Sequence, residues 1–137
     1  MIRHMLPATV LIAVVTAPAF AQDAPGGVGT RTPPPATGEQ VYRQVCQSCH
    51  MIDGKGGAGA ATITSLANNP KLRFPAYPIT IIAKGKGAMP WLTDMLSSAQ
   101  IAAVVGYVRT HFGNDYADPV TEEQVAKIAG PPPVGVH

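Results

Sequence analysis

The chain has 137 residues and a formal net charge of +2 at pH 7, and 46% of its residues are hydrophobic. This length predicts one small domain. The charge is too small to indicate nucleic-acid binding, which requires a clustered basic face. With 1 tryptophan, 14 glycines and 14 prolines, the ordered part has few residues that can build a hydrophobic core. Something else should therefore fill its centre.

The first residues have the pattern of an export signal. Arg3 supplies a positive charge, residues 6–20 are almost wholly apolar, and Ala19 and Ala21 give the small-x-small pattern of a cleavage site. A retained membrane anchor is the alternative, although the run is shorter than the roughly 20 apolar residues that span a bilayer. We expect residues 1–21 to be a signal peptide cleaved after Ala21. The mature protein is then periplasmic and has no membrane span.

A linker and a first helix should follow. Residues 22–36 are rich in proline and glycine and lack apolar periodicity, which predicts a linker. Order should begin at Thr37, because Thr37 and Gln40 fit a capping box. Val41 and Val45 then share one helix face, as in a short amphipathic helix.

The middle of the chain has weaker signals. Residues 54–61 are glycine-rich, but no strand precedes them and no Gly-Lys-Ser/Thr motif closes them, so we expect a surface loop and not a phosphate site. Several prolines exclude a long helix after this loop. Residues 79–84 should form one or two helical turns, although Thr80, Ile81 and Ile82 would also suit a strand.

The strongest helical pattern spans residues 97–113. It opens with a capping box from Ser97 to Gln100, its apolar residues recur at helical spacing, and Gly113 is placed as a stop. A further capping box predicts a last short helix over residues 121–130, before a proline-rich end.

The segment Cys46-Gln47-Ser48-Cys49-His50 carries the chemistry. C-x-x-C-H is the attachment signature of a c-type haem, in which both thiols add to the vinyl groups of the porphyrin and His50 becomes an axial iron ligand. A disulfide here would close a very small loop and constrain the unfolded chain little. Zinc usually needs four ligands, and thioredoxin-like chemistry needs a βαβ context. We therefore expect one haem c attached covalently to Cys46 and Cys49.

Met89 is the expected second axial ligand. Small residues precede it, and Pro90 biases it away from helical geometry, so its thioether can point at the iron. A core methionine is the alternative. We expect His111 to be a solvated helix residue and Met95 to have a core position.

The order of these segments resembles class I cytochrome c over residues 37–113. The matching positions are Gly38, Tyr42, Cys46, Cys49, His50, Gly87, Met89, Pro90 and Tyr107. The resemblance implies an all-α fold in which short helices and loops wrap around one covalent haem. It also implies that the first and last helices of this domain cross near Gly38 and Tyr107. Residues 114–137 would then be a C-terminal extension with a short helix.

The run from Val105 to Asn114 and residues 118–121 are similar to monohaem cytochrome subunits or partners of bacterial periplasmic dehydrogenases. This resemblance implies a dehydrogenase as electron donor and an oxidase or another cytochrome as acceptor. The family often has a proline before the leucine of the loop that holds the proximal histidine, whereas this chain has Thr64-Ser65-Leu66. The carbonyl that accepts the His50 ring proton is therefore not identified.

A histidine–methionine pair leaves no open position on the iron. We therefore expect single-electron transfer through an exposed haem edge, without an acid, base or nucleophile from the polypeptide. The alternatives are a peroxidase-like haem enzyme or sensor in which Met89 dissociates, and a small structural or metal-binding protein without haem. Lys84 and Lys86 should rim the haem face and could steer an acidic partner, with ordinary solvated charge as the alternative. Trp91 could contact the partner or pack on the ring.

Overall fold

The computed structural model describes residues 37–59 and 62–130. The expected signal peptide and linker, and the proline-rich end, lie outside the described residues. Among the helices in the described ranges, none is both long enough and apolar enough to cross a membrane.

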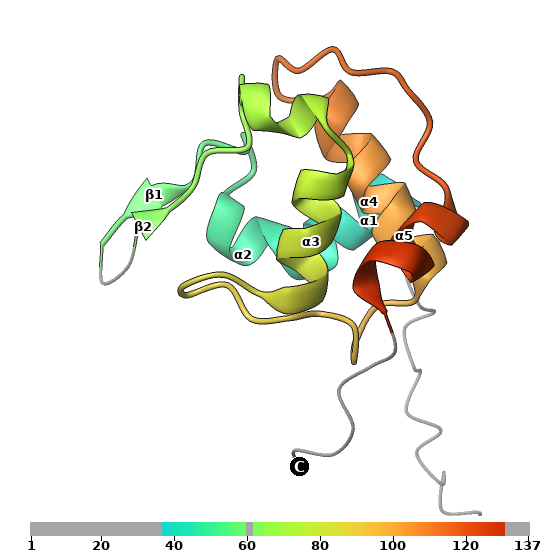
Figure 1. The fold of residues 1–137 in the computed structure, drawn as a ribbon. Coiled ribbons are helices and arrows are strands. Elements are labelled where there is room, and N and C mark those ends of the chain that lie inside the picture. Colours follow the sequence, from blue (N-terminus) through green and yellow to red (C-terminus); the bar gives the residue numbers. More distant parts are fainter. Residues whose placement is uncertain (1–36, 60–61, 131–137) are drawn as a thin grey trace, which may run out of the picture. The chain divides into compact units, whose positions relative to one another are not determined.

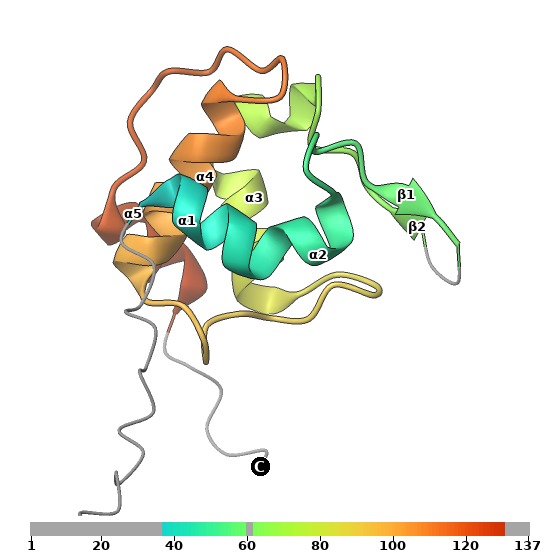
Figure 2. The same cartoon turned by 180° about the vertical axis from the view of Figure 1, so that it is seen from behind.

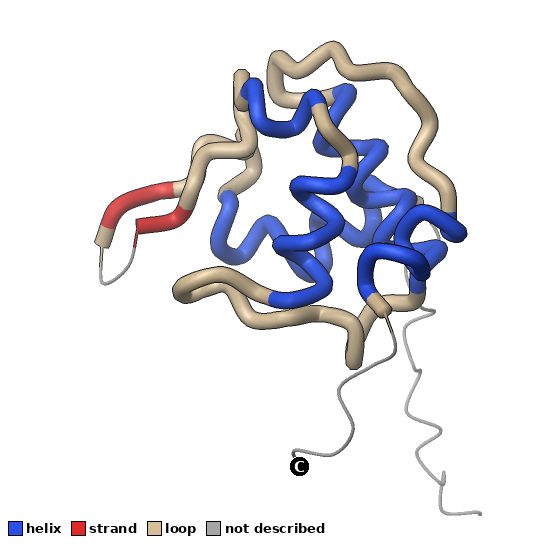
Figure 3. Tube along the Cα trace, in the orientation of Figure 1, coloured by secondary structure: helices blue, strands red, loops and turns tan. Residues whose placement is uncertain are grey.

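Helices dominate the described part of the chain, and loops connect them (Figures 1 and 3). In chain order the elements are α1 Gly38–Val41, the π-helix η1 Tyr42–Cys46, α2 Gln47–His50, β1 Gly57–Ala58, β2 Thr62–Ile63, the 3-10 helix η2 Pro70–Arg73, α3 Ala76–Lys84, α4 Ser98–Thr110 and α5 Glu122–Ala129. The first three elements follow one another without a break, so the expected first helix continues through a π-helical turn to His50.

Capping boxes begin α1, α4 and α5, as the sequence predicts. At Thr37, Ser97 and Thr121 the side-chain oxygen accepts a hydrogen bond from the backbone N–H of the glutamine three residues later. That glutamine side chain accepts in return from the backbone N–H of the cap residue. Each box satisfies N–H groups that the first helical turn leaves without partners.

Two middle segments differ from expectation. Helix α3 begins at Ala76 and not at Ile79, because Pro78 lies in the first turn, where its missing N–H removes no helical hydrogen bond. The expected surface loop over residues 54–61 is partly a β-ribbon: Gly57 pairs with Ile63 and Ala58 with Thr62 in antiparallel register. The ribbon projects away from the helices in Figure 1. The β-branched side chains of its second strand favour extended backbone.

Helices α1 and α4 lie side by side (Figure 2) and pack against one another. A Cβ atom built on Gly38 would lie 2.7 Å from Cβ of Tyr107 and would overlap the carbonyl oxygen of Ala103. Only glycine permits this approach. The implied crossing of the first and last helices at Gly38 and Tyr107 is confirmed.

One hydrophobic core joins these helices. Its buried members are Val41, Tyr42, Leu72, Ile79, Ile82, Leu92, Leu96, Ile101, Ala102, Val104, Val105, Val108 and Val125. Helix α5 packs against α3 and α4, and its residue Val125 is fully buried. The helix expected in the C-terminal extension therefore shares the core of the preceding residues.

Arg109 connects the chain before α5, at Asp118, to the core by hydrogen bonds. Its side chain is fully buried, and its Nε donates to the carbonyl of Leu72 over 2.9 Å. Its two terminal nitrogens donate to the carbonyls of Asp118 and Arg73. One of them also lies 3.6 Å from the exposed carboxylate of Asp118. Because a buried guanidinium needs such partners, these bonds tie α4 to η2 and to the chain that leads to α5.

Candidate functional site

A cavity of about 470 Å³ lies within the described part of the chain. Helices α2, η2, α3 and α4, the second strand and the loop between α3 and α4 all contribute to its walls. Apolar side chains make up much of the lining, among them Leu72, Ile82, Leu92, Val104 and Val108. This size and character are typical of sites that enclose a cofactor.

Cys46, Cys49 and His50 all line this cavity. Cys46 ends the π-helix and the other two lie on α2, so the continuous helical segment that begins at Gly38 places all three side chains at the cavity. Cys46 and Cys49 do not form a disulfide with one another. Burial, and secondarily the charge of Cys49, raises the pKa of the Cys46 thiol to about 11. Dithiol redox enzymes rely instead on a lowered thiol pKa, so this environment disfavours that alternative.

His50 is held by a single hydrogen bond from its ring. Nδ1 lies 3.0 Å from the carbonyl oxygen of Thr64 and donates its proton to it. Burial lowers the pKa of the imidazole, and the bond to Thr64 partly opposes this shift. A neutral ring whose Nδ1 proton is engaged leaves Nε2 free to bind a metal. Thr64 is the acceptor that the sequence did not identify.

Met89 lines the same cavity from the loop that follows α3. Its backbone is paired with Lys86: Lys86 N donates to Met89 O over 2.9 Å, and Met89 N donates to Lys86 O over 3.1 Å. Gly85 lies against this hairpin with a φ of +71°, and a Cβ atom on it would be 2.7 Å from the Met89 carbonyl oxygen. Local pairing and close glycine packing therefore fix the backbone that presents the thioether.

The donor set agrees with a covalently held haem and not with a bare metal ion. Two thiols on one helical segment, a neutral imidazole and a thioether face a cavity with apolar walls. In the described ranges no group of three or more His, Cys, Asp or Glu residues could hold a metal ion. The residues present thus fit a porphyrin, which brings its own four nitrogen ligands.

The family model described as "Cytochrome C oxidase, cbb3-type, subunit III" matches residues 33–108. The chain belongs to this cytochrome c family. Membership implies covalently bound haem c, in agreement with the donor set, and confirms the all-α class I cytochrome c fold that the sequence predicts.

Individual relatives of this cytochrome include dehydrogenase subunits. It is 34% identical over 104 residues to the alcohol dehydrogenase (quinone) cytochrome c subunits of Gluconacetobacter polyoxogenes and Komagataeibacter europaeus. The alignment covers 66% of this chain and 22% of each relative, so the chain spans about a fifth of their length. Among solved structures, cytochrome c6C from Synechococcus sp. PCC 7002 is 26% identical, with a TM-score of 0.47 over 53% of this chain and 90% of that one.

The basic residues around the cavity of this cytochrome differ in part from expectation. Lys86 lines the cavity, but Lys84 ends α3 as an exposed residue that does not line it. Lys71, which sequence reasoning missed, lines the cavity and lies 5.8 Å from the ring centre of Tyr77. Lys71 is distant in the sequence from the hairpin that holds Met89, and only the fold brings both to the cavity.

The other candidates near the site also have defined positions. Met95 is 67% exposed and lines the cavity, so the expected core position is wrong: the turn after Leu92 directs Leu92 and Leu96 inward and Met95 outward. Trp91 does not line the cavity, and its Nε1 donates to Asp94. His111 is exposed, as expected, and stacks on Tyr107 just after the end of α4.

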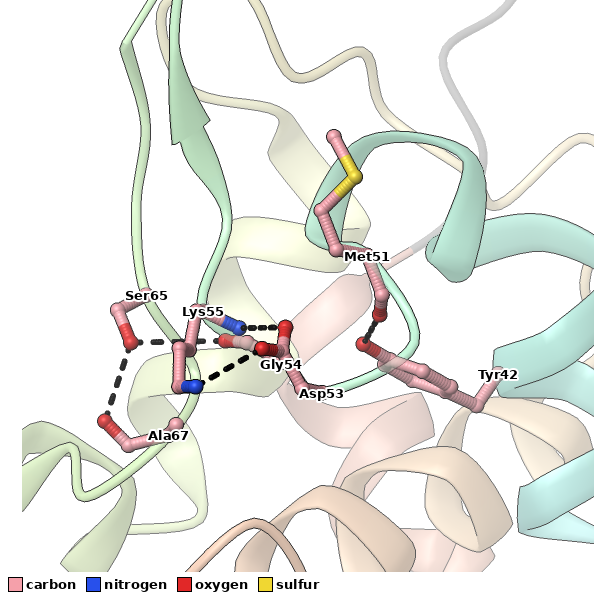
Figure 4. Close-up of polar contacts among 7 residues, drawn as sticks. All are labelled: Tyr42, Met51, Asp53, Gly54, Lys55, Ser65 and Ala67. Atoms are coloured by element: carbon pink, nitrogen blue, oxygen red, sulfur yellow. Dashed lines mark hydrogen bonds and ion pairs between the residues drawn. The ribbon is translucent and has the colours of Figure 1, made fainter.

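The loop after His50 is braced on both sides (Figure 4). The Tyr42 hydroxyl donates to the Met51 carbonyl over 2.6 Å, and Lys55 pairs with Asp53 over 3.0 Å. Further along, the Ser65 hydroxyl donates to the Ala67 carbonyl over 3.1 Å. These contacts hold the loop between His50 and Thr64 and the residues that follow Thr64.

Proposed function

We propose that this chain is a periplasmic monohaem c-type cytochrome that transfers single electrons and is not itself an enzyme. In this proposal Cys46 and Cys49 hold the haem through thioether bonds, and His50 and Met89 are the axial ligands of its iron. The observation that carries the proposal is that all four side chains line one cavity with apolar walls.

The haem supplies a one-electron iron couple when it is bound in this cavity. The residues of the chain adjust that couple. The Thr64 carbonyl, by accepting the Nδ1 proton, increases the electron-donor strength of His50. The thioether of Met89 is a soft ligand that favours reduced iron, and the apolar walls disfavour the higher charge of oxidised iron. With His50 and Met89 both holding the iron, no position would remain on it for a substrate.

Electrons should enter and leave where the cavity reaches the surface. Cys49, Lys86 and Met95 are exposed residues that also line the cavity, so this part of the haem would lie within reach of a partner. Lys71 and Lys86 are basic, and no aspartate or glutamate is among the described residues that line the cavity. An acidic partner surface would complement this rim, and redox encounters of this kind usually bury small interfaces.

We propose a dehydrogenase subunit as the electron donor and an oxidase or another cytochrome as the acceptor. The names of the relatives, cytochrome c subunits of quinone-dependent alcohol dehydrogenases, support the donor class. In the same proposal residues 1–21 are a cleaved signal peptide, residues 22–36 a linker, residues 37–113 the cytochrome domain and residues 114–137 an extension.

The first experiment tests the haem and its attachment. The full chain is produced in a bacterial host that matures c-type cytochromes, and the mass and visible spectrum of the purified protein are measured. We expect one haem per chain that remains attached after denaturation, and loss of this attachment when Cys46 and Cys49 are both replaced by alanine. A colourless and compactly folded wild-type protein would contradict the proposal.

The second experiment tests electron transfer and whether the partner docks at the basic rim of the cavity. The oxidised protein is mixed with the reduced catalytic subunit of a quinone-dependent alcohol dehydrogenase in a stopped-flow instrument. We expect Lys86→Glu to slow reduction on the order of tenfold at low salt, because the rim charge steers association. Lys84→Glu is the matched control, since Lys84 does not line the cavity and should matter less. Equal rates for the wild-type protein and both variants would contradict docking at this rim.

A further inference from the structure

Three consecutive carbonyl groups in the loop after β2 each accept a hydrogen bond from a side chain of a different segment. Thr64 O accepts from His50 Nδ1 over 3.0 Å. The next two carbonyls accept from asparagines: Ser65 O from Asn69 Nδ2 over 2.7 Å, and Leu66 O from Asn114 Nδ2 over 2.8 Å. The carbonyl that orients the proposed iron ligand is therefore the first of a row of three that are all held in place.

Asn69 links this row to the start of η2. Its side-chain oxygen accepts from Lys71 N over 3.0 Å, which caps η2, while its amide donates to Ser65 O. Its own backbone N–H donates to Asn114 Oδ1 over 2.9 Å. The two asparagines are thus bonded to one another and to neighbouring carbonyls of the loop.

Asn114 links the same row to the end of α4. It is only 7% exposed, and its amide nitrogen also donates to Val108 O over 2.8 Å and to His111 O over 2.9 Å. Val108 lines the cavity. Asn114 therefore connects α4, which forms a wall of the cavity, to the loop whose Thr64 carbonyl binds His50.

The hydrogen bonds to these three carbonyls matter for the position of the Thr64 carbonyl, because the loop Thr64-Ser65-Leu66 contains no proline. A proline would restrict the residue before it to extended backbone. Without one, the Thr64 carbonyl is positioned by the hydrogen bonds of the loop. These are the bonds of Leu66 N and Ala67 N to the Gly54 carbonyl and the asparagine bonds to the two carbonyls beside Thr64. A hydrogen bond to the outer nitrogen of a ligating histidine fixes its ring and raises its basicity.

We propose that Asn69 and Asn114 are positioning residues for the axial histidine. By holding the Ser65 and Leu66 carbonyls they keep the Thr64 carbonyl against His50 Nδ1, and in this way they set the donor strength of the ring and the reduction potential of the iron. The inference rests on the proposed ligation of iron by His50.

The test uses the mature holoprotein with two readouts: the reduction potential, and the solvent-exchange rate of the His50 Nδ1 proton measured by NMR. The variant Asn69→Ser keeps an oxygen that can cap η2 but loses the amide that donates to Ser65 O. Asn114→Ala removes all the Nδ2 bonds. In both we expect faster exchange of the His50 proton and an upward shift of the potential, because a weaker bond makes the ring a poorer donor to oxidised iron. The effect should be larger in Asn114→Ala.

Thr121→Ala is the control for lost stability, since it removes the cap of α5, whose hydrogen bonds are to Gln124 and not to either asparagine. It should leave the potential and the proton exchange unchanged. If Asn69→Ser lowers stability as much as the control does and changes neither readout, the asparagines are structural only and the inference is overturned, even where Asn114→Ala fails to fold. Absence of iron-shifted His50 signals in the wild-type protein would instead refute the proposed ligation.

Discussion

Gly38 of α1 lies so close to Tyr107 of α4 that a Cβ atom on the glycine would be 2.7 Å from Cβ of the tyrosine. Any side chain at this position must separate the two helices. The contact therefore fixes where the first helix lies against the core, and with it the three residues that we propose to bind the haem.

We expect Gly38→Ala to lower the free energy of unfolding by about 1–3 kcal/mol, the usual cost of overpacking. The matched control is Gly106→Ala in the interior of α4, where a Cβ atom would meet nothing within 4 Å. There the change should raise stability by roughly 0.5–1 kcal/mol, because alanine restricts the unfolded chain more than glycine. Denaturant unfolding of both variants measures the difference, and equal stabilities would contradict the crossing.

The assignment of Met89 predicts a specific spectroscopic loss. Met89→Ala should abolish the sulfur-to-iron charge-transfer band and lower the reduction potential, because the soft ligand that favours reduced iron is removed. The haem should stay attached. Met95→Ala is the control, since Met95 lines the same cavity but is 67% exposed. Retention of the band in Met89→Ala, or its loss in Met95→Ala, would reject the assignment.

Gly85 should be needed for the proposed bond between Met89 and the iron, because it packs against the hairpin that presents Met89. A Cβ atom on Gly85 would lie 2.7 Å from the Met89 carbonyl oxygen and 2.9 Å from the backbone nitrogen of Trp91. We therefore expect Gly85→Ala to displace the hairpin and to weaken the charge-transfer band in the visible spectrum. Gly87→Ala is a matched control: Gly87 also has a positive φ, +61°, but its Cβ position is open. Both variants carry backbone strain of about 1–3 kcal/mol, and only the first should perturb the iron spectrum.

The raised pKa of Tyr42 predicts that the folded protein loses stability at high pH. Burial above all, with a smaller contribution from Tyr107, raises its pKa from 10.0 to about 12. The folded protein therefore keeps a proton that the unfolded chain releases between these values, so this contribution to stability is complete below pH 10 and is lost as the pH rises towards 12.

Denaturant unfolding across this pH range measures the effect. In Tyr42→Phe the corresponding slope should disappear, and the loss of the hydrogen bond to Met51 should cost about 0.5–1.5 kcal/mol at neutral pH. A wild-type slope that persists in Tyr42→Phe would show that another group is responsible.

Features encoded by neighbouring residues could be predicted from the sequence. The three capping boxes bind atoms three residues apart, so Thr37, Ser97 and Thr121 could be recognised without any knowledge of the fold. The haem motif is equally local, because its two thiols and its imidazole lie within five consecutive residues. The crossing of α1 and α4 could not be predicted from residue spacing. The contact of Gly38 with Tyr107 was predicted from the family resemblance.

Other contacts between distant segments were decided by the tertiary structure alone. Thr64 meets His50 across 14 positions of the chain, and Asn69 meets Asn114 across 45. Backbone carbonyls and asparagine amides occur throughout any chain, so no local pattern distinguishes the ones that will meet. The composition indicated that something other than side chains should fill the centre, and the motif indicated a haem. How firmly the chain holds the ring of His50 depends on packing that brings α2, the loop after β2 and the end of α4 together.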